Sequence, residues 1–225
     1  LGVAPGLLAD LHVNAECETR IAKLGGKLLV GLVRKAFVII GRENFAGDFG
    51  GRLDALVNNA AIIWPSAIED TSLEAYMAVI NVNQVGCFLG MKTAMPLLKE
   101  SGGGSIVNVA SFVAHMGAAT PQVAYTASKG AVLAMTREIA VIYARQGIRA
   151  NSLCPGPIMT PMLAKFLSDD AKRNRRLVHI PMGRFGDPSE IANGALFLAS
   201  DESSWMTGQS LIIDGGITAA YVTPE

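Results

Sequence analysis

The stretch Ala124-Tyr125-Thr126-Ala127-Ser128-Lys129 opens an apolar, helix-like run that extends to Ala144. Tyr125 and Lys129 are four residues apart, so a helix through this stretch places both side chains on one face, one turn apart. An ammonium group close to a phenol favours the phenolate and lowers the tyrosine pKa from about 10, as a general acid or base requires. Because Tyr-x-x-x-Lys also occurs by chance in many helices, the pair alone does not define a catalytic site.

Four further motifs accompany this stretch in a fixed order. They are Leu53-Asp54-Ala55-Leu56-Val57-Asn58-Asn59-Ala60-Ala61, Asn83-Gln84-Val85-Gly86-Cys87-Phe88, Gly104-Ser105-Ile106-Val107-Asn108-Val109-Ala110-Ser111 and Asn151-Ser152-Leu153-Cys154-Pro155-Gly156-Pro157. In this order and at these spacings the chain closely resembles the short-chain dehydrogenase/reductase family, from about Leu53 to Gly216. The resemblance implies a Rossmann-type α/β fold, with a doubly wound parallel sheet in three αβα layers. It also implies hydride transfer between a nicotinamide cofactor and a secondary alcohol or carbonyl.

The resemblance assigns catalytic roles to four polar residues. Tyr125 gives or takes the alcohol proton, Lys129 lowers the tyrosine pKa and binds the nicotinamide ribose, and Ser111 polarises the carbonyl. Asn83 maintains a proton relay to Lys129, with Asn81 as the alternative for this role. Together these groups are expected to stabilise the charge that develops on the substrate oxygen.

The assignment of Ser111 depends on spacing. Ser111 lies 14 residues before Tyr125, whereas family members commonly have one residue fewer between the two. The shorter spacing falls on Phe112, which has no hydroxyl to donate. Ser111 is therefore the expected residue, and the loop 115–123 is expected to hold one extra residue. His115 in this loop is expected to be a loop or pocket-wall residue rather than a base.

The cofactor is expected at the carboxyl ends of the strands, where open α/β sheets bind their ligands. By resemblance, the predicted cofactor-binding residues are Asp10, Asn58, Ala60, Tyr125, Lys129, Pro155, Gly156, Ile158 and Thr160. Ile158 and Thr160 belong to a loop that in the family anchors the nicotinamide carboxamide. The alternative for this loop is a rigid Pro-Gly turn in which Thr160 caps a helix.

Asp10 decides the expected choice between NAD and NADP. If it ends a strand at Leu7 to Asp10, its carboxylate accepts hydrogen bonds from the adenosine ribose and repels a 2′-phosphate, which favours NAD over NADP. An ordinary aspartate that ends a strand and opens a turn is an equally good interpretation.

The first fifty residues depart from the family pattern. Only glycine lets the backbone approach the pyrophosphate closely, yet the 24 glycines form neither Thr-Gly-x-x-x-Gly-x-Gly nor Gly-x-Gly-x-x-Gly. If Leu7 to Asp10 is the family's second strand and Lys27 to Val33 its third, the first strand and helix are missing. We therefore expect a single domain, with a truncated cofactor half at 1–52, a catalytic half at 53–216 and a tail at 217–225. The alternative to an enzyme is an inactive scaffold for dimerisation or binding.

Composition and charge exclude other classes of protein. Lys and Arg number 19, as do Asp and Glu, so a nucleic-acid partner is not expected. No uninterrupted apolar run approaches the roughly 18 residues of a membrane span, and no signal peptide is evident. Cys17, Cys87 and Cys154 contain no Cys-x-x-Cys pair, which predicts reduced thiols in a cytoplasmic protein and no metal site.

The expected partners are a small-molecule alcohol or carbonyl substrate and further copies of the chain. One face of the Tyr125 helix carries small residues, namely Ala127, Gly130, Ala131 and Ala134. Such a face allows close packing of helix on helix, and the family pairs this helix across a dimer interface. We therefore expect a homodimer or a homotetramer.

Overall fold

A computed structural model describes residues 28–30, 52–118, 120–160, 163–164, 167 and 169–220. Within these ranges one parallel sheet has the strand order β1-β2-β3-β4-β5. The strands are β1 (Leu28–Val30), β2 (Ala55–Asn58), β3 (Gly104–Val109), β4 (Ile148–Pro155) and β5 (Ser210–Ile213). Each strand pairs in parallel with the next strand along the chain. All carboxyl ends therefore lie at one edge of the sheet.

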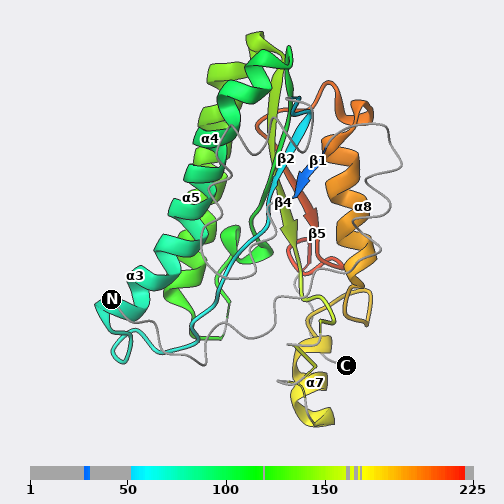
Figure 1. Cartoon of the computed structure of the whole chain (residues 1–225). Helices are drawn as coiled ribbons and strands as arrows, with labels where there is room; N and C mark the ends of the chain where they lie inside the picture. Colours follow the sequence, from blue (N-terminus) through cyan, green and yellow to red (C-terminus); the bar gives the residue numbers. More distant parts are fainter. Residues whose placement is uncertain are drawn as a thin grey trace.

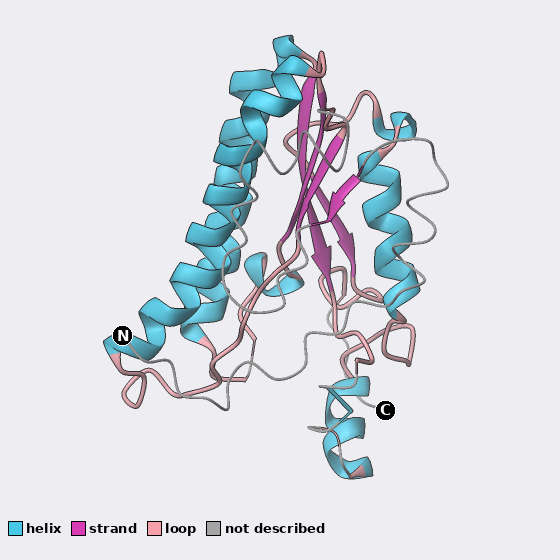
Figure 2. Ribbon diagram, in the orientation of Figure 1, coloured by secondary structure: helices cyan, strands magenta, loops and turns pink. Residues whose placement is uncertain are grey.

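Helices cover both faces of this sheet (Figure 1). The helices α3 (Leu73–Ile80), α4 (Gly86–Glu100) and α5 (Val123–Tyr143) lie on one face, and α8 (Pro188–Ala199) lies on the other. Figure 2 shows the strands between the two helical layers, and α7 (Asp170–Leu177) lies beyond the carboxyl ends of β4 and β5. The expected three-layer Rossmann-type arrangement is confirmed.

The sequence predicted a third strand at Lys27 to Val33 but did not assign its neighbour in the sheet. In the structure Leu28, Leu29 and Val30 pair directly with Ala55, Leu56 and Val57. Three apolar residues fit beside any buried strand, so the sequence carries no information about which neighbour they choose. The expected strand at 7–10, which includes Asp10, lies outside the described residues, as does the helix expected after Arg34.

Side chains that alternate along β2, β3 and β4 build two apolar clusters, one on each face of the sheet. The cluster toward α4 and α5 includes Leu56, Met91, Leu98, Ile106, Val132, Ile148 and Cys154. The cluster toward α8 includes Val57, Val107, Leu153 and Leu198. These strands are therefore buried on both faces, as is usual for a parallel sheet covered by helices. No helix in the described ranges has both the length and the hydropathy needed to cross a membrane.

The helical segment that begins after Ser72 contains a wider turn. Ser72 caps α3 by accepting a hydrogen bond from the Ala75 amide (3.1 Å). Residues Asn81–Val85 then form a π-helical turn before α4 begins. Such turns redirect side chains and are frequent at functional sites. Here the turn buries Asn83, which is 2% exposed.

Candidate active site

Ser111, Tyr125 and Lys129 meet at the carboxyl edge of β3. Ser111 follows this strand by two residues, and Tyr125 and Lys129 occupy the first two turns of α5. Ser111 is a neighbour of Tyr125, and hydrogen bonding from its side chain acts to lower the pKa of the Tyr125 phenol. Lys129 Nζ lies 5.6 Å from the centroid of the Tyr125 ring. The structure therefore brings together three side chains that the sequence separates by up to eighteen positions.

Lys129 is a buried ammonium group. Lys129 is only 3% exposed, and its Nζ donates a hydrogen bond to the Val109 carbonyl (2.7 Å). Burial lowers the pKa of Lys129 to about 8, and the neighbouring thiols of Cys87 and Cys154 oppose this shift. Lys129 is thus a cation near neutral pH that loses its proton far more readily than an exposed lysine.

The pKa of Tyr125 is shifted in the direction opposite to the expected one. Burial raises it, and the hydrogen bond with Ser111 lowers it by less. The sequence analysis expected Lys129 to lower this pKa. In the structure, Lys129 Nζ is directed to the Val109 carbonyl, so desolvation of the phenolate outweighs the attraction of the ammonium group.

Asn83 links the π turn to two other segments. Its Oδ1 accepts a hydrogen bond from the Ile62 amide (2.8 Å), and its Nδ2 donates to the Ile62 carbonyl (2.9 Å) and to Ser128 Oγ (2.9 Å). Ser128 Oγ in turn donates to the Tyr125 carbonyl (2.7 Å). Asn81, the alternative, is exposed at the beginning of the turn. The Asn83 side chain therefore fixes the first turn of α5 to the segment after β2.

Two other predicted cofactor residues follow β2. Asn58 ends the strand, and its Nδ2 donates to Asn108 Oδ1 on β3 (2.8 Å). A Cβ atom on Gly90 of α4 would lie 2.3 Å from Asn58 Oδ1, so the side chain packs closely against that helix. Ala60 lies two residues further, and is partly buried. Contacts with β3 and α4 thus explain the position of the Asn58 side chain. Its role in cofactor binding stays a prediction.

Pro155 and Gly156 lie where β4 ends. Gly156 donates a backbone hydrogen bond to Ile213 of β5 (2.9 Å). A Cβ atom on Gly156 would lie 2.5 Å from the Asp214 Cα atom, so only glycine allows this close approach. These contacts therefore fix the position of Gly156, from which the next loop leaves the edge of the sheet.

The next loop carries Ile158 and Thr160. Ile158 forms an isolated parallel bridge with Gly186. Thr160 Oγ1 accepts a hydrogen bond from the Leu163 amide (3.2 Å), as in the capping alternative that the sequence left open. The binding of a carboxamide by this loop remains a prediction.

Cys154 lies beside the site, which the sequence did not indicate. Its thiol is a neighbour of Ser111, and His115 Nε2 lies 3.5 Å from the Cys154 sulfur. Burial raises the pKa of the Cys154 thiol to about 11, so the thiol is neutral. His115 is exposed at the end of the short 3₁₀ helix that Ser111 begins, as a residue of the loop should be. The sequence around Cys154 is largely apolar and gave no indication that this residue lies next to Ser111 and His115.

The residues of this edge fit the nicotinamide end of a dinucleotide. Lys129 has three N–H donors, of which the Val109 carbonyl accepts one, and the hydroxyl groups of Ser111 and Tyr125 can each donate and accept. Such a donor set suits ribose hydroxyls and a substrate oxygen. In the described part of the chain, no three His, Cys, Asp or Glu side chains gather as a metal site.

Comparisons with known proteins agree with this geometry. A family model described as enoyl-(acyl carrier protein) reductase matches residues 41–218. The 2,5-dichloro-2,5-cyclohexadiene-1,4-diol dehydrogenase LinX of Sphingobium indicum is 44% identical over 168 residues, which cover 75% of this chain and 66% of that protein, just under two thirds of its length. The 2-(S)-hydroxypropyl-CoM dehydrogenase 3 of Xanthobacter autotrophicus is 36% identical over 220 residues, which cover 94% of this chain and 86% of that protein. Among solved structures, a gluconate 5-dehydrogenase from Burkholderia cenocepacia in complex with NADP and tartrate has a TM-score of 0.75 and 32% identity, and the match covers 80% of this chain and 69% of that one.

Proposed function

Because the chain belongs to the short-chain dehydrogenase/reductase family, we propose that it is a nicotinamide-dependent oxidoreductase that interconverts a secondary alcohol and a carbonyl. The observation that carries this proposal is the position of Tyr125 beside Ser111 and the buried ammonium group of Lys129. A phenol next to a cation and a hydroxyl group is suited to exchange a proton with a substrate oxygen.

The chemistry divides between cofactor and protein. A bound nicotinamide supplies or accepts the hydride. Ser111 donates a hydrogen bond to the substrate oxygen, and Tyr125 delivers a proton to that oxygen in reduction or removes it in oxidation. Lys129 stabilises the phenolate that forms, because its charge lies close to the ring in a buried environment. Asn83 holds the first turn of α5 in place through Ser128, and so orients Tyr125.

For the cofactor itself, we propose NAD, with NADP as the less favoured alternative. Its support is the Asp10 carboxylate at the end of a predicted strand, which lies outside the described residues. The gluconate 5-dehydrogenase of known structure holds NADP, so both cofactors belong in any binding test. The proposed binding groups on the described part of the chain are Asn58, Ala60, Tyr125, Lys129, Pro155, Gly156, Ile158 and Thr160.

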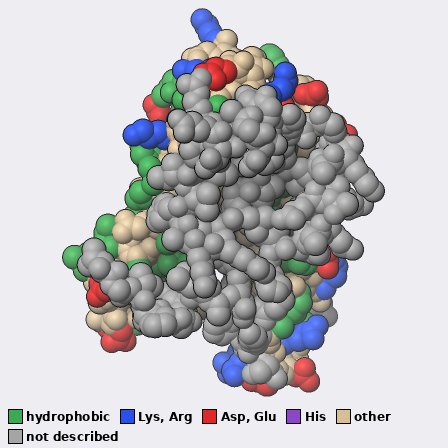
Figure 3. Space-filling model, viewed as in Figure 1, with side chains coloured by type: hydrophobic (Ala, Val, Ile, Leu, Met, Phe, Trp, Pro, Cys, Tyr) green, Lys and Arg blue, Asp and Glu red, His purple; other side chains and the backbone are tan. Residues whose placement is uncertain are grey.

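We further propose that the 225-residue chain forms one domain that assembles as a homodimer or homotetramer in the cytoplasm. Large apolar side chains are exposed on the layer of α3, α4 and α5, among them Leu73 (76%), Phe88 (48%) and Val141 (80%). Figure 3 shows hydrophobic side chains along the left side of the molecule, where Figure 1 places α3, α4 and α5. A second copy of the same layer would cover them. The cytoplasmic location rests on Cys87 and Cys154, which are free thiols.

The experiment that tests the function is a titration of the purified chain with NADH and with NADPH, followed by nicotinamide fluorescence. Saturable binding of either nucleotide supports the proposal. A folded chain that binds neither nucleotide would be the inactive scaffold and would contradict the proposed function.

A further inference from the structure

The backbone around Gly186 is joined to the loop that carries Ile158. The Gly186 amide donates to the Pro157 carbonyl (3.1 Å), and the Met159 amide donates to the Gly186 carbonyl (2.9 Å). A Cβ atom on residue 186 would lie 2.6 Å from Ile158 Cδ1, so a larger residue here would have to displace the end of the Ile158 side chain. The short segments 157–159 and 186 therefore form one closed pair of hydrogen bonds.

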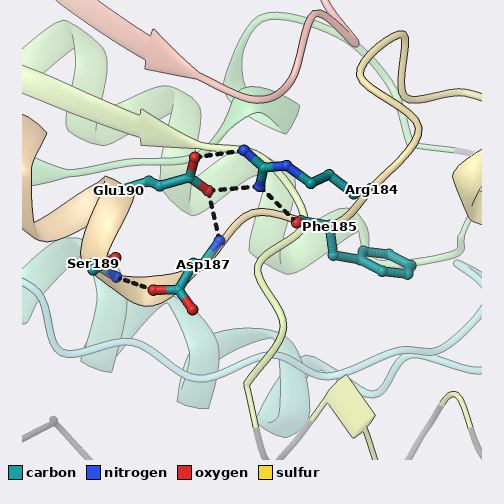
Figure 4. Close-up of polar contacts among 5 residues, drawn as sticks. All are labelled: Arg184, Phe185, Asp187, Ser189 and Glu190. Carbon is teal, nitrogen blue, oxygen red and sulfur yellow. Dashed lines mark hydrogen bonds and ion pairs between the residues drawn. The ribbon is translucent and has the colours of Figure 1, made fainter.

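An ion pair holds the opposite side of the same two peptide units (Figure 4). Arg184 binds Glu190 through two contacts, Nη2 to Oε1 (2.7 Å) and Nη1 to Oε2 (2.9 Å). Arg184 Nη1 also donates to the Phe185 carbonyl (3.2 Å). Glu190 Oε2 accepts a hydrogen bond from the Asp187 amide (2.7 Å). The pair thus contacts the backbone immediately before and immediately after Gly186.

Each of the two peptide units therefore has both of its polar groups engaged. In the unit between Phe185 and Gly186, the carbonyl faces Arg184 and the N–H binds Pro157. In the unit between Gly186 and Asp187, the N–H faces Glu190 and the carbonyl accepts from Met159. Because a peptide unit is planar and rigid, fixing one polar group fixes the direction of the other.

We propose that Arg184 and Glu190 are positioning residues for the loop 157–160, which they orient through the backbone of Gly186. This inference rests on the proposed function, in which Ile158 and Thr160 anchor the cofactor. The pair touches neither substrate nor cofactor in this account. It sets the direction in which the loop leaves the end of β4.

The location of the pair separates this role from simple stabilisation. The side chains are 51% and 38% exposed, and an exposed ion pair contributes little to the unfolding free energy. Phe185 is buried with Ile180 and Leu167, and Asp187 caps α8 through its own carboxylate (2.8 Å to the Ser189 amide). The fold around the pair thus has independent support. Hydrogen bonds from Arg184 and the Asp187 amide lower the pKa of Glu190 to about 2, which keeps it ionised at neutral pH.

The test compares Arg184→Met, Arg184→Lys and Glu190→Gln in the full chain. Arg184→Met removes the guanidinium group and with it both contacts to Glu190. Arg184→Lys keeps the positive charge without the two-point contact. Glu190→Gln removes the negative charge but keeps a carbonyl oxygen that can accept from the Asp187 amide. Arg52→Ala is the matched control, because it breaks an exposed ion pair with Asp54 (2.7 Å) that is far from Arg184 in the sequence. Amide hydrogen exchange of the protein without nucleotide and the Kd for NADH and NADPH are measured for each variant.

We expect the Met159 and Gly186 amides to exchange about tenfold faster in Arg184→Met, while thermal unfolding changes little. We also expect the nucleotide Kd to rise about three- to tenfold, with Glu190→Gln and Arg184→Lys between Arg184→Met and the parent. Unchanged exchange at these amides, or equally faster exchange throughout the chain, would overturn the positioning role. If the parent chain binds no nucleotide, the proposed function fails, and the exchange result alone still decides whether the pair orients the loop.

Discussion

The side-chain amide of Asn83 donates a hydrogen bond to Ser128 Oγ at 2.9 Å, although the two residues are 45 positions apart. Ser128 is fully buried, and its hydroxyl passes the contact on to the Tyr125 carbonyl. The π turn and the first turn of α5 are therefore one hydrogen-bonded unit.

Ser128→Ala and Asn83→Ala are expected to be destabilising, because each leaves buried polar groups without a partner. We expect losses of about 1–3 kcal/mol in the free energy of unfolding, with the larger loss for Asn83→Ala, which also frees both polar groups of Ile62. Urea denaturation of the single and double variants measures this. Strictly additive losses in the double variant would show that the two side chains do not act as a unit.

Lys129 is expected to make stability depend on pH in the alkaline range. Its pKa is about 8 in the folded chain, against a value of 10.5 when unperturbed. Between these values the unfolded chain binds more protons than the folded chain, so the contribution of Lys129 to stability rises with pH. Below pH 8 both states are protonated and the contribution is constant.

The comparison with Lys129→Met isolates this effect from the thiols and tyrosines that titrate in the same range. The difference in unfolding free energy should shift in favour of the parent as pH rises from about 8 to about 10.5, on the order of a few kcal/mol. A difference that stays constant over this range would mean that Lys129 is not desolvated.

Gly90→Ala is expected to destabilise the chain by about 1–3 kcal/mol, since the added methyl group meets the Asn58 carboxamide at 2.3 Å. Gly130→Ala is the matched control in a second helix, because nothing lies within 4 Å of its added Cβ atom. Helix propensity alone predicts that this control is stabilised by up to about 1 kcal/mol. Equal effects of the two substitutions in thermal unfolding would contradict the packing of Asn58 against α4.

Cys87 and Cys154 are expected to resist alkylation in the folded chain. Burial raises the pKa of Cys87 to about 12 and that of Cys154 to about 11, so little thiolate exists near neutral pH. Mass spectrometry after iodoacetamide treatment should show labelling of either residue at least about a hundredfold slower in the native protein than in urea. Rapid native labelling of Cys154 would contradict its burial beside Ser111.

The sequence predicted those parts of the fold that depend on local pattern. The motifs that begin at Leu53, Gly104 and Asn151 located β2, β3 and β4. The motif order also predicted that Ser111, Tyr125 and Lys129 meet, because each follows or faces the carboxyl edge of a strand. These features are encoded within a few residues of where they occur.

Features that arise from contacts between distant segments were not predicted. The π turn at Asn81–Val85 buries Asn83, whose side chain bonds to Ile62 and Ser128, and no local pattern marks it. The neighbour of Leu28–Val30 and the direction of the Tyr125 pKa shift also depend on tertiary packing. The ion pair of Arg184 and Glu190 was not predicted either. It contacts the backbone on both sides of Gly186, and no local sequence pattern indicates such contacts.

The most direct test of the proposed function is steady-state oxidation of a panel of secondary alcohols, followed by nicotinamide absorbance, for the parent chain and for Tyr125→Phe. We expect turnover by the parent and a loss of about 10²–10⁴-fold in kcat for Tyr125→Phe. Equal turnover by both proteins would contradict the role of Tyr125 as the proton donor. A parent chain that binds nucleotide yet turns over no alcohol or carbonyl of the panel would contradict its assignment as an enzyme of this class.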